Sequence, residues 1–364
     1  MKSIYKSIGE LVERIDQRNT DGSVTNLIGV SIDKKFISSV ANVIGTDLTK
    51  YKVIEKYDFA VSLMQVSRDE KIPVACQKEF DKAIMSPAYP IFRVKDKSVV
   101  LPEYLEMWFM RPEFDREASF IAVGGVRGSM PWEEFANMKL PVPSIDEQLE
   151  IVNAYKAITD RIALKKRIND NLEATAQAVL QDKIVSNGIE TTVDSLIDLF
   201  DSMRRPMSSL DRSGMERIYP YYGAASLMDY VDDYIFDGIY GLLGEDGTVM
   251  DDNGYPTMQY VWGKFWVNNH AHIFQGKNGY STEMVYLILK KTVVRNAVTG
   301  AVQLKINQEN LRKLPVIVPC DDDLTELNAL IGKVFLTIRE NRTEIEQLAN
   351  LKDILLAKMM TSSR

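Results

Sequence analysis

The residues with the clearest potential for chemistry stand at 268–272, in the run Asn-Asn-His-Ala-His, which holds the only two histidines of the chain. On a strand, His270 and His272 would point to the same face, where a carboxylate of Glu245 or Asp246 could complete a metal site. The spacing fixes no third ligand. We therefore favour a turn and the start of a strand, whose polar side chains satisfy backbone groups or line a binding surface, and we expect no metal.

Patterns that would support other kinds of catalysis are missing from the sequence. No glycine-rich run precedes Lys-Ser or Lys-Thr as in a phosphate-binding loop, and no Asn-Pro-Pro-Tyr or Asp-Pro-Pro-Tyr run could hold an amino group for methylation. Residues 244–247, Gly-Glu-Asp-Gly, are typical of a tight turn with solvated or structural carboxylates. Cys76 and Cys320 lie far apart, which predicts neither a disulfide framework nor a zinc site. We expect a chain that is not an enzyme and binds no cofactor itself.

The elements that must position these residues form an internal repeat. A stretch that begins at Gly124 returns at Gly300, and at this same offset the match continues to Pro143 and Pro319 and into the sequence that follows. Upstream, the strand at 90–94 recurs at 272–275 and the short helix at 102–109 recurs at 282–289, both at slightly larger offsets, and beyond them the copies diverge. This repeat predicts two modules that share a scaffold and carry different surface segments.

A long helical pattern follows each copy. From Ile151, and again from its repeat counterpart Leu327, apolar residues alternate spacings of four and three, which is the heptad seam of a coiled coil. Residues 144–147 are typical of a capping box. Because each helix follows a globular module, we expect the helices to pair antiparallel, each about 55 Å long. Lys165 and its counterpart Asn341 interrupt the seam, either fixing the register or marking a kink or an exposed edge.

The predicted fold class is therefore α+β, with two mixed α/β globular domains separated by two long helices that pair as an antiparallel coiled coil. We expect a first globular domain at residues 1–143, a central helix at 144–187, a second globular domain at 188–319 and a C-terminal helix at 320–364. A length of 364 residues is enough for each domain to bury a core.

Composition and charge limit the class of protein and its partners only weakly. The hydrophobic fraction of 45% is that of a globular protein, and no apolar run approaches the length of a membrane helix. The first six residues lack the apolar region of a signal peptide, so we expect a cytoplasmic protein without a membrane contact. A net charge of −7 argues mildly against nucleic acid as a partner, but four arginines crowd residues 204–217, and such a patch can bind DNA on an acidic protein.

The ordered set of segments resembles the specificity subunits of type I DNA restriction–modification systems. The resemblance is carried by residues 126–135, 140–148, 221–224, 243–247 and 268–273. It covers the whole chain in the order recognition domain, helix, recognition domain, helix. The second copy departs from the pattern at 321–324, where Asp-Asp-Asp-Leu replaces Ile-Asp-Glu-Gln, so the start of its helix lacks the Glu-Gln pair.

The resemblance implies that each globular domain is a target recognition domain that reads one half of a bipartite, asymmetric site in double-stranded DNA. The helices would set the spacing between the half-sites and dock two modification (methyltransferase) subunits. S-adenosylmethionine is expected on those partner subunits, and motor and nuclease activity on restriction subunits.

Candidate residues follow from chemistry and from place in the repeat. Base edges are read by Arg, Asn and Gln, and phosphates are bound by basic side chains. The candidates for DNA contact are Arg68, Lys78, Arg127, Arg204, Arg205, Asn268, Asn269, His270, His272, Lys277, Asn278, Gln303 and Lys305. The candidates for partner docking and the coiled coil are Glu147, Gln148, Ile151, Ile158, Ile162, Leu172, Leu327, Val334, Ile338 and Leu348. Readout loops are expected in the diverged parts, near 60–85 and 200–217.

Two other functions stay open from the sequence. The chain could be an assembly scaffold for DNA-modifying subunits without readout of its own. It could also be a metal-dependent enzyme built around His270, His272 and Glu245.

Overall fold

The computed structural model describes residues 5–39, 46–125, 128–300 and 303–359. The chain forms two compact units: Met1–Leu164 with Ile345–Arg364, and Lys165–Glu344. Both long helices contribute to both units, so the four-segment division predicted from the sequence stays a prediction. Among the described residues, no helix combines the length and the apolar character that crossing a bilayer requires.

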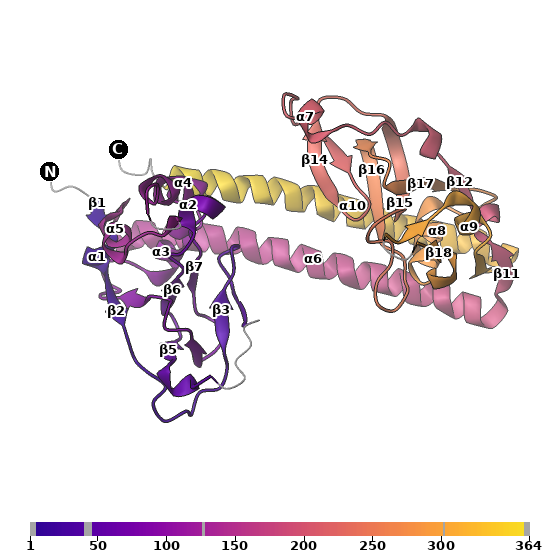
Figure 1. Cartoon of the computed structure of the whole chain (residues 1–364). Helices are drawn as coiled ribbons and strands as arrows, with labels where there is room; N and C mark the ends of the chain where they lie inside the picture. The colour runs from indigo at the N-terminus through magenta and orange to yellow at the C-terminus, as the bar shows by residue number, and fades with distance from the viewer. Residues whose placement is uncertain (1–4, 40–45, 126–127, 301–302, 360–364) are drawn as a thin grey trace. The chain divides into compact units, whose positions relative to one another are not determined.

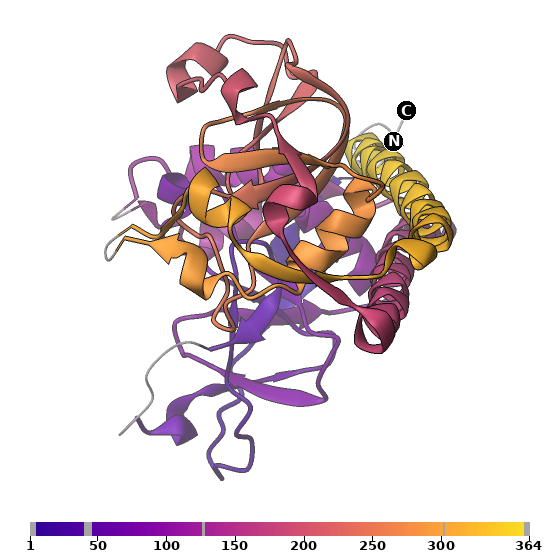
Figure 2. The ribbon, with the colours of Figure 1, turned by 90° about the vertical axis from the view of Figure 1, so that its right-hand side faces the viewer.

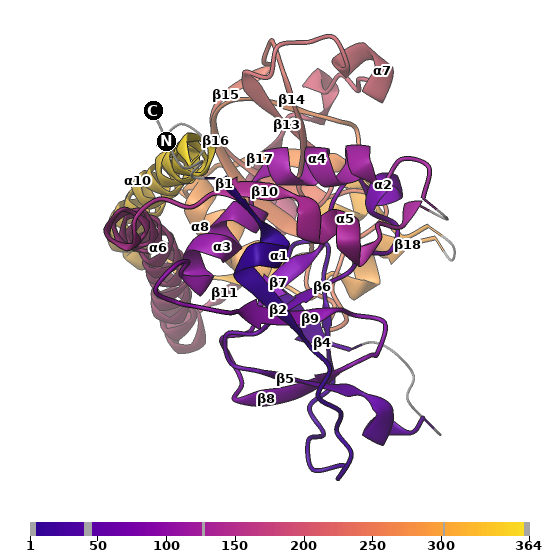
Figure 3. The same ribbon diagram turned by 90° about the vertical axis from the view of Figure 1, so that its left-hand side faces the viewer.

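The first unit is built on an antiparallel sheet of four short strands in the order β2-β9-β6-β7. Helix α3 lies against β7 (Figure 3). The aromatic rings of Phe59, Phe92, Phe109 and Phe135 pack against one another in the apolar core, with Phe59 and Phe109 edge to face. The strands are β1 (Tyr5–Ser7), β2 (Val12–Ile15), β3 (Ile28–Val30), β4 (Phe36–Ser38), β5 (Lys52–Glu55), β6 (Phe59–Val61), β7 (Val74–Cys76), β8 (Lys82–Met85), β9 (Ile91–Val94) and β10 (Lys139–Pro141). The helices are α1 (Ile8–Leu11), α2 (Val66–Asp69), α3 (Pro102–Phe109), α4 (Pro112–Ile121) and α5 (Trp132–Asn137).

The second unit is built on a larger sheet of six strands in the order β12-β17-β15-β16-β13-β14, in which only β13 and β16 run parallel. Helix α8 packs across β15, β16 and β17 (Figure 2). A Cβ on Gly241 of β15 would lie 2.1 Å from the Phe274 ring of β17, so this close approach requires glycine. The strands are β11 (Ile189–Thr192), β12 (Ile197–Leu199), β13 (Tyr219–Tyr222), β14 (Leu227–Val231), β15 (Phe236–Gly244), β16 (Met258–Val267), β17 (Ala271–Gly276), β18 (Val298–Thr299), β19 (Lys305–Ile306) and β20 (Pro315–Val318). The helices are η4 (Asp201–Met203), α7 (Ser209–Arg212), α8 (Thr282–Lys290) and α9 (Gln308–Arg312).

Two long helices run through the chain, α6 (Ile145–Asn187) and α10 (Asp321–Lys358) (Figure 1). The predicted capping box is present at the start of α6, where Ser144 Oγ accepts from Glu147 N at 3.4 Å and Glu147 Oε2 accepts from Ser144 N at 2.9 Å. Together with the two mixed modules, these helices confirm the α+β class. Two antiparallel contacts join them in the second unit: Lys165 Nζ donates to Asn341 Oδ1 at 2.7 Å, and Lys183 Nζ meets Asp323 Oδ1 at 2.7 Å.

The two units repeat one attachment of module to helix. In the first, Gln148 Oε1 accepts from Leu101 N at 2.9 Å and its Nε2 donates to Val99 O at 2.9 Å. In the second, Asn328 Oδ1 accepts from Ser281 N at 3.0 Å, and Nδ2 donates to the carbonyl of Gly279. Ser281 and Gly279 are the counterparts of Leu101 and Val99 at the offset of the paired helices α3 and α8, whereas Asn328 lies one helical turn beyond Leu324, the counterpart of Gln148. Both units therefore make the same attachment, the second from the next turn of its helix. In each unit the side-chain amide on the long helix, that of Gln148 or of Asn328, satisfies backbone groups just before α3 or α8.

Candidate nucleic-acid interface

Three turns meet at one end of the large sheet in the second unit. We call residues 244–247, 268–270 and 303–306 the turn cluster. Backbone hydrogen bonds join its parts: Glu245 N donates to His270 O at 2.8 Å, Ile306 N to Glu245 O at 2.9 Å, and Gly247 N to Leu304 O at 3.0 Å. The first two turns meet because the end of β15 pairs with the start of β17, Gly244 against Ala271, and a bridge between Asp246 and Lys305 adds the third segment.

A buried histidine supports the cluster from below. His272 has no exposed side-chain surface, its Nδ1 lies 2.6 Å from Asp201 Oδ2, and its Nε2 lies 2.8 Å from Ile306 O. Both ring nitrogens thus lie within hydrogen-bond distance of an oxygen atom. Asp201 also accepts from Ile273 N at 2.8 Å and Gln308 Nε2 at 2.6 Å. Burial favours the neutral Asp201 carboxyl, but the hydrogen bond and charge of His272 outweigh it and hold the pKa of Asp201 below its usual range.

A second carboxylate joins the cluster to two cations. Glu245 Oε2 lies 2.5 Å from Arg204 Nη1, and Glu245 Oε1 lies 3.0 Å from Lys305 Nζ. Burial would raise the pKa of Glu245, but the hydrogen bonds from Arg204 and Lys305 bring it below the usual value. Arg204 also donates to Ala271 O at 2.7 Å, so its guanidinium stabilises the fold from within.

The side chains of Asp201, Glu245 and His272 lie close enough to be considered as metal ligands, within 4.8 Å of one another. Their ligand atoms are already engaged by Arg204 and Lys305 among other donors. A divalent cation would have to displace these two positive charges, so the geometry favours an ion-pair network over a metal centre.

The structure brings seven of the thirteen sequence-predicted DNA residues to the turn cluster or directly beneath it. Asn269, His270, Gln303 and Lys305 are exposed on its surface, and His270 Nδ1 lies 2.6 Å from Asp246 Oδ1. The other three lie underneath: Arg204 and His272 as described, and Asn268, which is 4% exposed and accepts from His270 N at 2.8 Å. These three support the turns, and a buried side chain such as His272 offers no surface to a base.

Three other predicted residues of the second unit lie apart from the cluster. Lys277 and Asn278 follow the far end of β17, where Lys277 Nζ meets Asp198 Oδ1 at 3.5 Å and Asn278 Nδ2 donates to Ser195 O at 2.8 Å. Arg205 is exposed, and its carbonyl accepts from Trp266 Nε1 at 2.6 Å. Contact of these residues with DNA stays a prediction.

The predicted residues of the first unit are placed only in part. Arg127 lies outside the described residues. Arg68 in α2 is exposed beside Gly128, a Cβ on which would lie 3.3 Å from Arg68 N, and its guanidinium pairs with Asp69 at 2.7 Å. Lys78 forms an ion pair with Glu106 of α3. Their roles at DNA stay predictions as well.

Sequence reasoning predicted a readout loop near 200–217, but not the full exposed surface of the second unit on α7, β13 and β14 to which this loop belongs. Leu210 is 81% exposed and Met228 55% exposed, and Arg217 lies over the Tyr230 ring with 5.4 Å between Cζ and the centroid. It also missed Asp201 and Gln308, because no spacing pattern marks residues that meet only through the fold. The arginine-rich stretch at 204–217 was the available signal for this surface.

The residues predicted for docking and the coiled coil mostly face their own unit. Gln148, Leu327 and Ile338 are buried, and Glu147 belongs to the helix cap. Ile151, Leu172 and Val334 are half-buried against the unit cores. The remaining three, Ile158, Ile162 and Leu348, are half-buried on the long helices. Docking of a partner at any of them stays a prediction.

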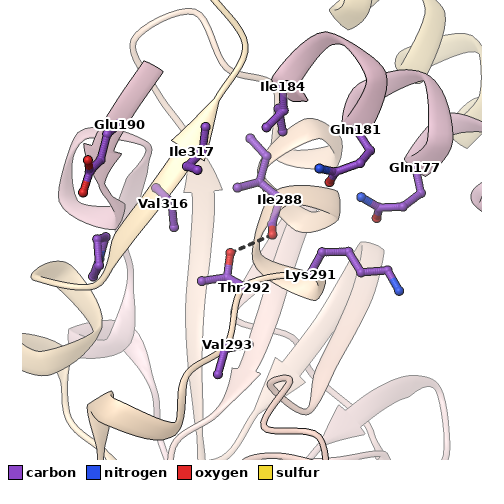
Figure 4. A pocket seen from close by; sticks show the side chains of 11 residues that line it. Gln177, Gln181, Ile184, Glu190, Ile288, Lys291, Thr292, Val293, Val316 and Ile317 are labelled. Atoms are coloured by element: carbon purple, nitrogen blue, oxygen red, sulfur yellow. Dashed lines mark hydrogen bonds between the residues drawn. The ribbon is translucent and has the colours of Figure 1, made fainter. Parts of the chain in front are cut away.

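A groove runs along a long helix in each unit. In the second unit it encloses about 480 Å³ between Gln177 and Gln181 of α6, Thr292 and Val293 after α8, and β20 (Figure 4). In the first it encloses about 520 Å³, and its lining includes Pro112, Glu113, Asp353 and Ala357. Asp353 and Ala357 are the repeat counterparts of Gln177 and Gln181, and Thr292 and Val293 are those of Pro112 and Glu113. The two units therefore carry the same groove with different linings.

Comparison with known proteins finds similarity to one protein family over part of the chain. Residues 190–354 match the model of the type I restriction modification DNA specificity domain. A putative type I restriction enzyme specificity subunit of Haemophilus influenzae is 32% identical over 128 residues, which cover 35% of this chain and 32% of that protein. The type I restriction enzyme HindI specificity subunit of the same organism is 22% identical over 186 residues, 49% of this chain and 40% of that protein. The chain thus spans well under half the length of these curated relatives.

One solved structure shares the fold over almost the whole chain. It is the crystal structure of a type I restriction–modification system S subunit from M. genitalium, with a TM-score of 0.56 at 13% identity, covering 98% of this chain and 95% of that one. At this identity the likeness concerns the fold. Residues 190–354 thus match a type I restriction modification DNA specificity domain, and the chain as a whole is similar in fold to that S subunit.

Proposed function

We propose that the chain is a sequence-specific DNA-binding specificity subunit that reads a bipartite, asymmetric site and has no catalytic activity of its own. Each globular module reads one half-site, and the long helices set the spacing. The observation that carries this proposal is one scaffold built twice, down to the Gln148 and Asn328 attachments, with different exposed segments on each copy. Two diverged surfaces on equal supports are what the reading of two different half-sites requires.

The turn cluster has the chemistry for readout in the second module. Asn269 and Gln303 present amides that can bond adenine in the major groove, and Lys305 presents an ammonium for phosphate or guanine. Lys305 is 47% exposed although it pairs with Glu245, so its remaining N–H groups are open to a ligand. The basic and apolar surface on α7 and β13–β14 extends this face for further contact with the duplex.

The partners follow from the same duplication. Two equivalent grooves support the docking of two copies of one partner, which we propose is a methyltransferase subunit that carries S-adenosylmethionine. Restriction subunits with motor and nuclease activity would join the assembly through these subunits. The groove of the first unit has many charged side chains in its lining and that of the second unit has few, and this difference predicts unequal affinities for the two copies.

The direct test is reconstitution with a type I methyltransferase subunit. Sequencing that detects methylated bases should find methylation at one bipartite sequence when both proteins are present, and no sequence-specific methylation when either is omitted. Methylation without sequence preference by the complex would overturn the readout role. Methylation by this chain alone would overturn its assignment as a non-catalytic subunit.

A further inference from the structure

The segment 303–306 carries two of the exposed candidates for DNA contact, and it is held to the second module at Ile306 by both backbone groups. Ile306 N donates to Glu245 O at 2.9 Å. Ile306 O accepts from His272 Nε2 at 2.8 Å. Besides its backbone contacts with residues 245–247 and with β18, the segment that carries Gln303 and Lys305 is thus held by one buried ring.

The ring is fixed from its other side by a carboxylate. His272 Nδ1 lies 2.6 Å from Asp201 Oδ2, and Asp201 also accepts from Gln308 Nε2, just after the segment. Glu245, whose carbonyl accepts from Ile306 N, is neutralised by Arg204 and by Lys305 of the segment itself. The segment is thus attached through a network of two carboxylates, two cations and one imidazole, of which only Lys305 is exposed.

The first module provides a natural contrast. The repeat counterpart of Ile306, at the offset that relates Gly124 to Gly300, is Met130, whose N donates to Leu63 O at 2.8 Å. Leu63 stands where the second module has Glu245, and Pro90 stands where it has His272, both at the offset of the upstream strand. Leucine and proline side chains offer no polar donor, so the first module keeps the backbone contact and has no equivalent of the ring contact.

We propose that His272, held by Asp201, is a positioning residue for DNA readout: it sets the place of residues 303–306 in the second module and has no such role in the first. This inference rests on the proposed function, because it assigns a role within half-site reading. His272 itself touches no base, since its side chain has no exposed surface. Its removal takes the ring donor from the carbonyl of Ile306, and the segment keeps only its contacts with residues 245–247 and with β18.

The conservative variants separate the two contacts of the ring. His272→Gln places an amide donor near the position of Nε2 and can keep the bond to Ile306 O. His272→Asn places its amide near Nδ1 and can keep only the bond to Asp201. His272→Ala removes both. If His272 only stabilised the core, the loss of base preference in the three variants would follow their loss of thermal stability.

The test uses the full chain with its methyltransferase subunit and a duplex DNA library with a randomised stretch, from which bound molecules are selected and sequenced. We expect His272→Ala to weaken base preference in one half-site on the order of tenfold, with the other half-site and the gap unchanged. We expect His272→Gln to restore more of that preference than His272→Asn. Equal loss in both half-sites, no loss in either, or equal rescue by Asn and Gln would overturn the inference.

A measurement without DNA separates this inference from the proposed function. Hydrogen exchange should accelerate in peptides covering 303–312 of His272→Ala and stay unchanged in peptides covering 128–136 of the first module. Unchanged exchange at 303–312 would refute the positioning role even if DNA is read. If exchange accelerates but the wild-type complex selects no bipartite sequence, the ring holds the segment and the proposed reading of DNA is wrong.

Discussion

Lys165 donates a hydrogen bond to Asn341 at 2.7 Å, and the two residues occupy the same position of the internal repeat. When a residue contacts its own repeat counterpart, the local twofold axis that relates the two paired helices lies between these two residues. Lys165 also pairs with Glu344 at 2.8 Å, and Asn341 donates to Asn169 at 2.7 Å. The polar interruption of the seam is therefore a satisfied network, the arrangement that fixes register in paired helices.

Replacing Asn341 should destabilise the second unit. Asn341→Ala removes the oxygen that accepts from Lys165 and the N–H that donates to Asn169. Because these positions are partly or fully buried, the change should cost about 1–3 kcal/mol of unfolding free energy. Urea denaturation measures it. Lys166→Ala, on the neighbouring exposed position, is the control and should change stability by under about 0.5 kcal/mol. A loss no larger than that of the control would mean that the network is not structural.

The amide attachments should act locally. Gln148→Ala leaves Leu101 N and Val99 O without partners, and Asn328→Ala does the same to Ser281 N and Gly279 O. Each should cost about 1–3 kcal/mol and accelerate hydrogen exchange at the start of α3 or α8 in its own unit only. Gln347→Ala, exposed on α10, is the matched control. Exchange that rises in both units for either variant would contradict the local role.

The close packing at Gly241 predicts opposite results for two glycine substitutions. Gly241→Ala places a methyl group 2.1 Å from the Phe274 ring and should destabilise by roughly 1–3 kcal/mol or more. Gly332→Ala, inside α10 with no atom within 4 Å of the new Cβ, should stabilise by up to about 1 kcal/mol through helix propensity. Thermal unfolding of both variants measures the difference, and a neutral Gly241→Ala would show that the sheet can relax there.

Acid should weaken the network beneath the turn cluster. The pKa values of Asp201 and Glu245 are lowered in the folded protein, so their contribution to stability is present above the ordinary values of 3.8 and 4.5 and is lost as pH falls below them. We expect the urea midpoint to fall below about pH 4.5, and Asp201→Asn to reduce that dependence while lowering stability at neutral pH. A midpoint in Asp201→Asn that falls with acid as steeply as in the wild type would exclude Asp201 as a source.

The α+β class followed from sequence because the heptad spacing and the internal repeat are regular signals that can be read along the chain. The roles of individual site residues were harder to predict from the sequence. His272 and Arg204 were expected at DNA, yet they lie inside, since their exposure depends on which segments cover the end of the sheet. Lys277 lies close to His272 in the sequence, but a strand rises about 3.3 Å per residue, which carries Lys277 roughly 16 Å away.

The most direct test of the account is an exchange of one module. The second globular module, residues 188–319, would be replaced by that of another specificity subunit, and methylated sites would be mapped with the same methyltransferase subunit. The account predicts a new sequence in one half-site, with the other half-site and the spacing between them unchanged. A methylated sequence that stays the same, or that changes in both halves, would contradict the claim that each module reads its own half.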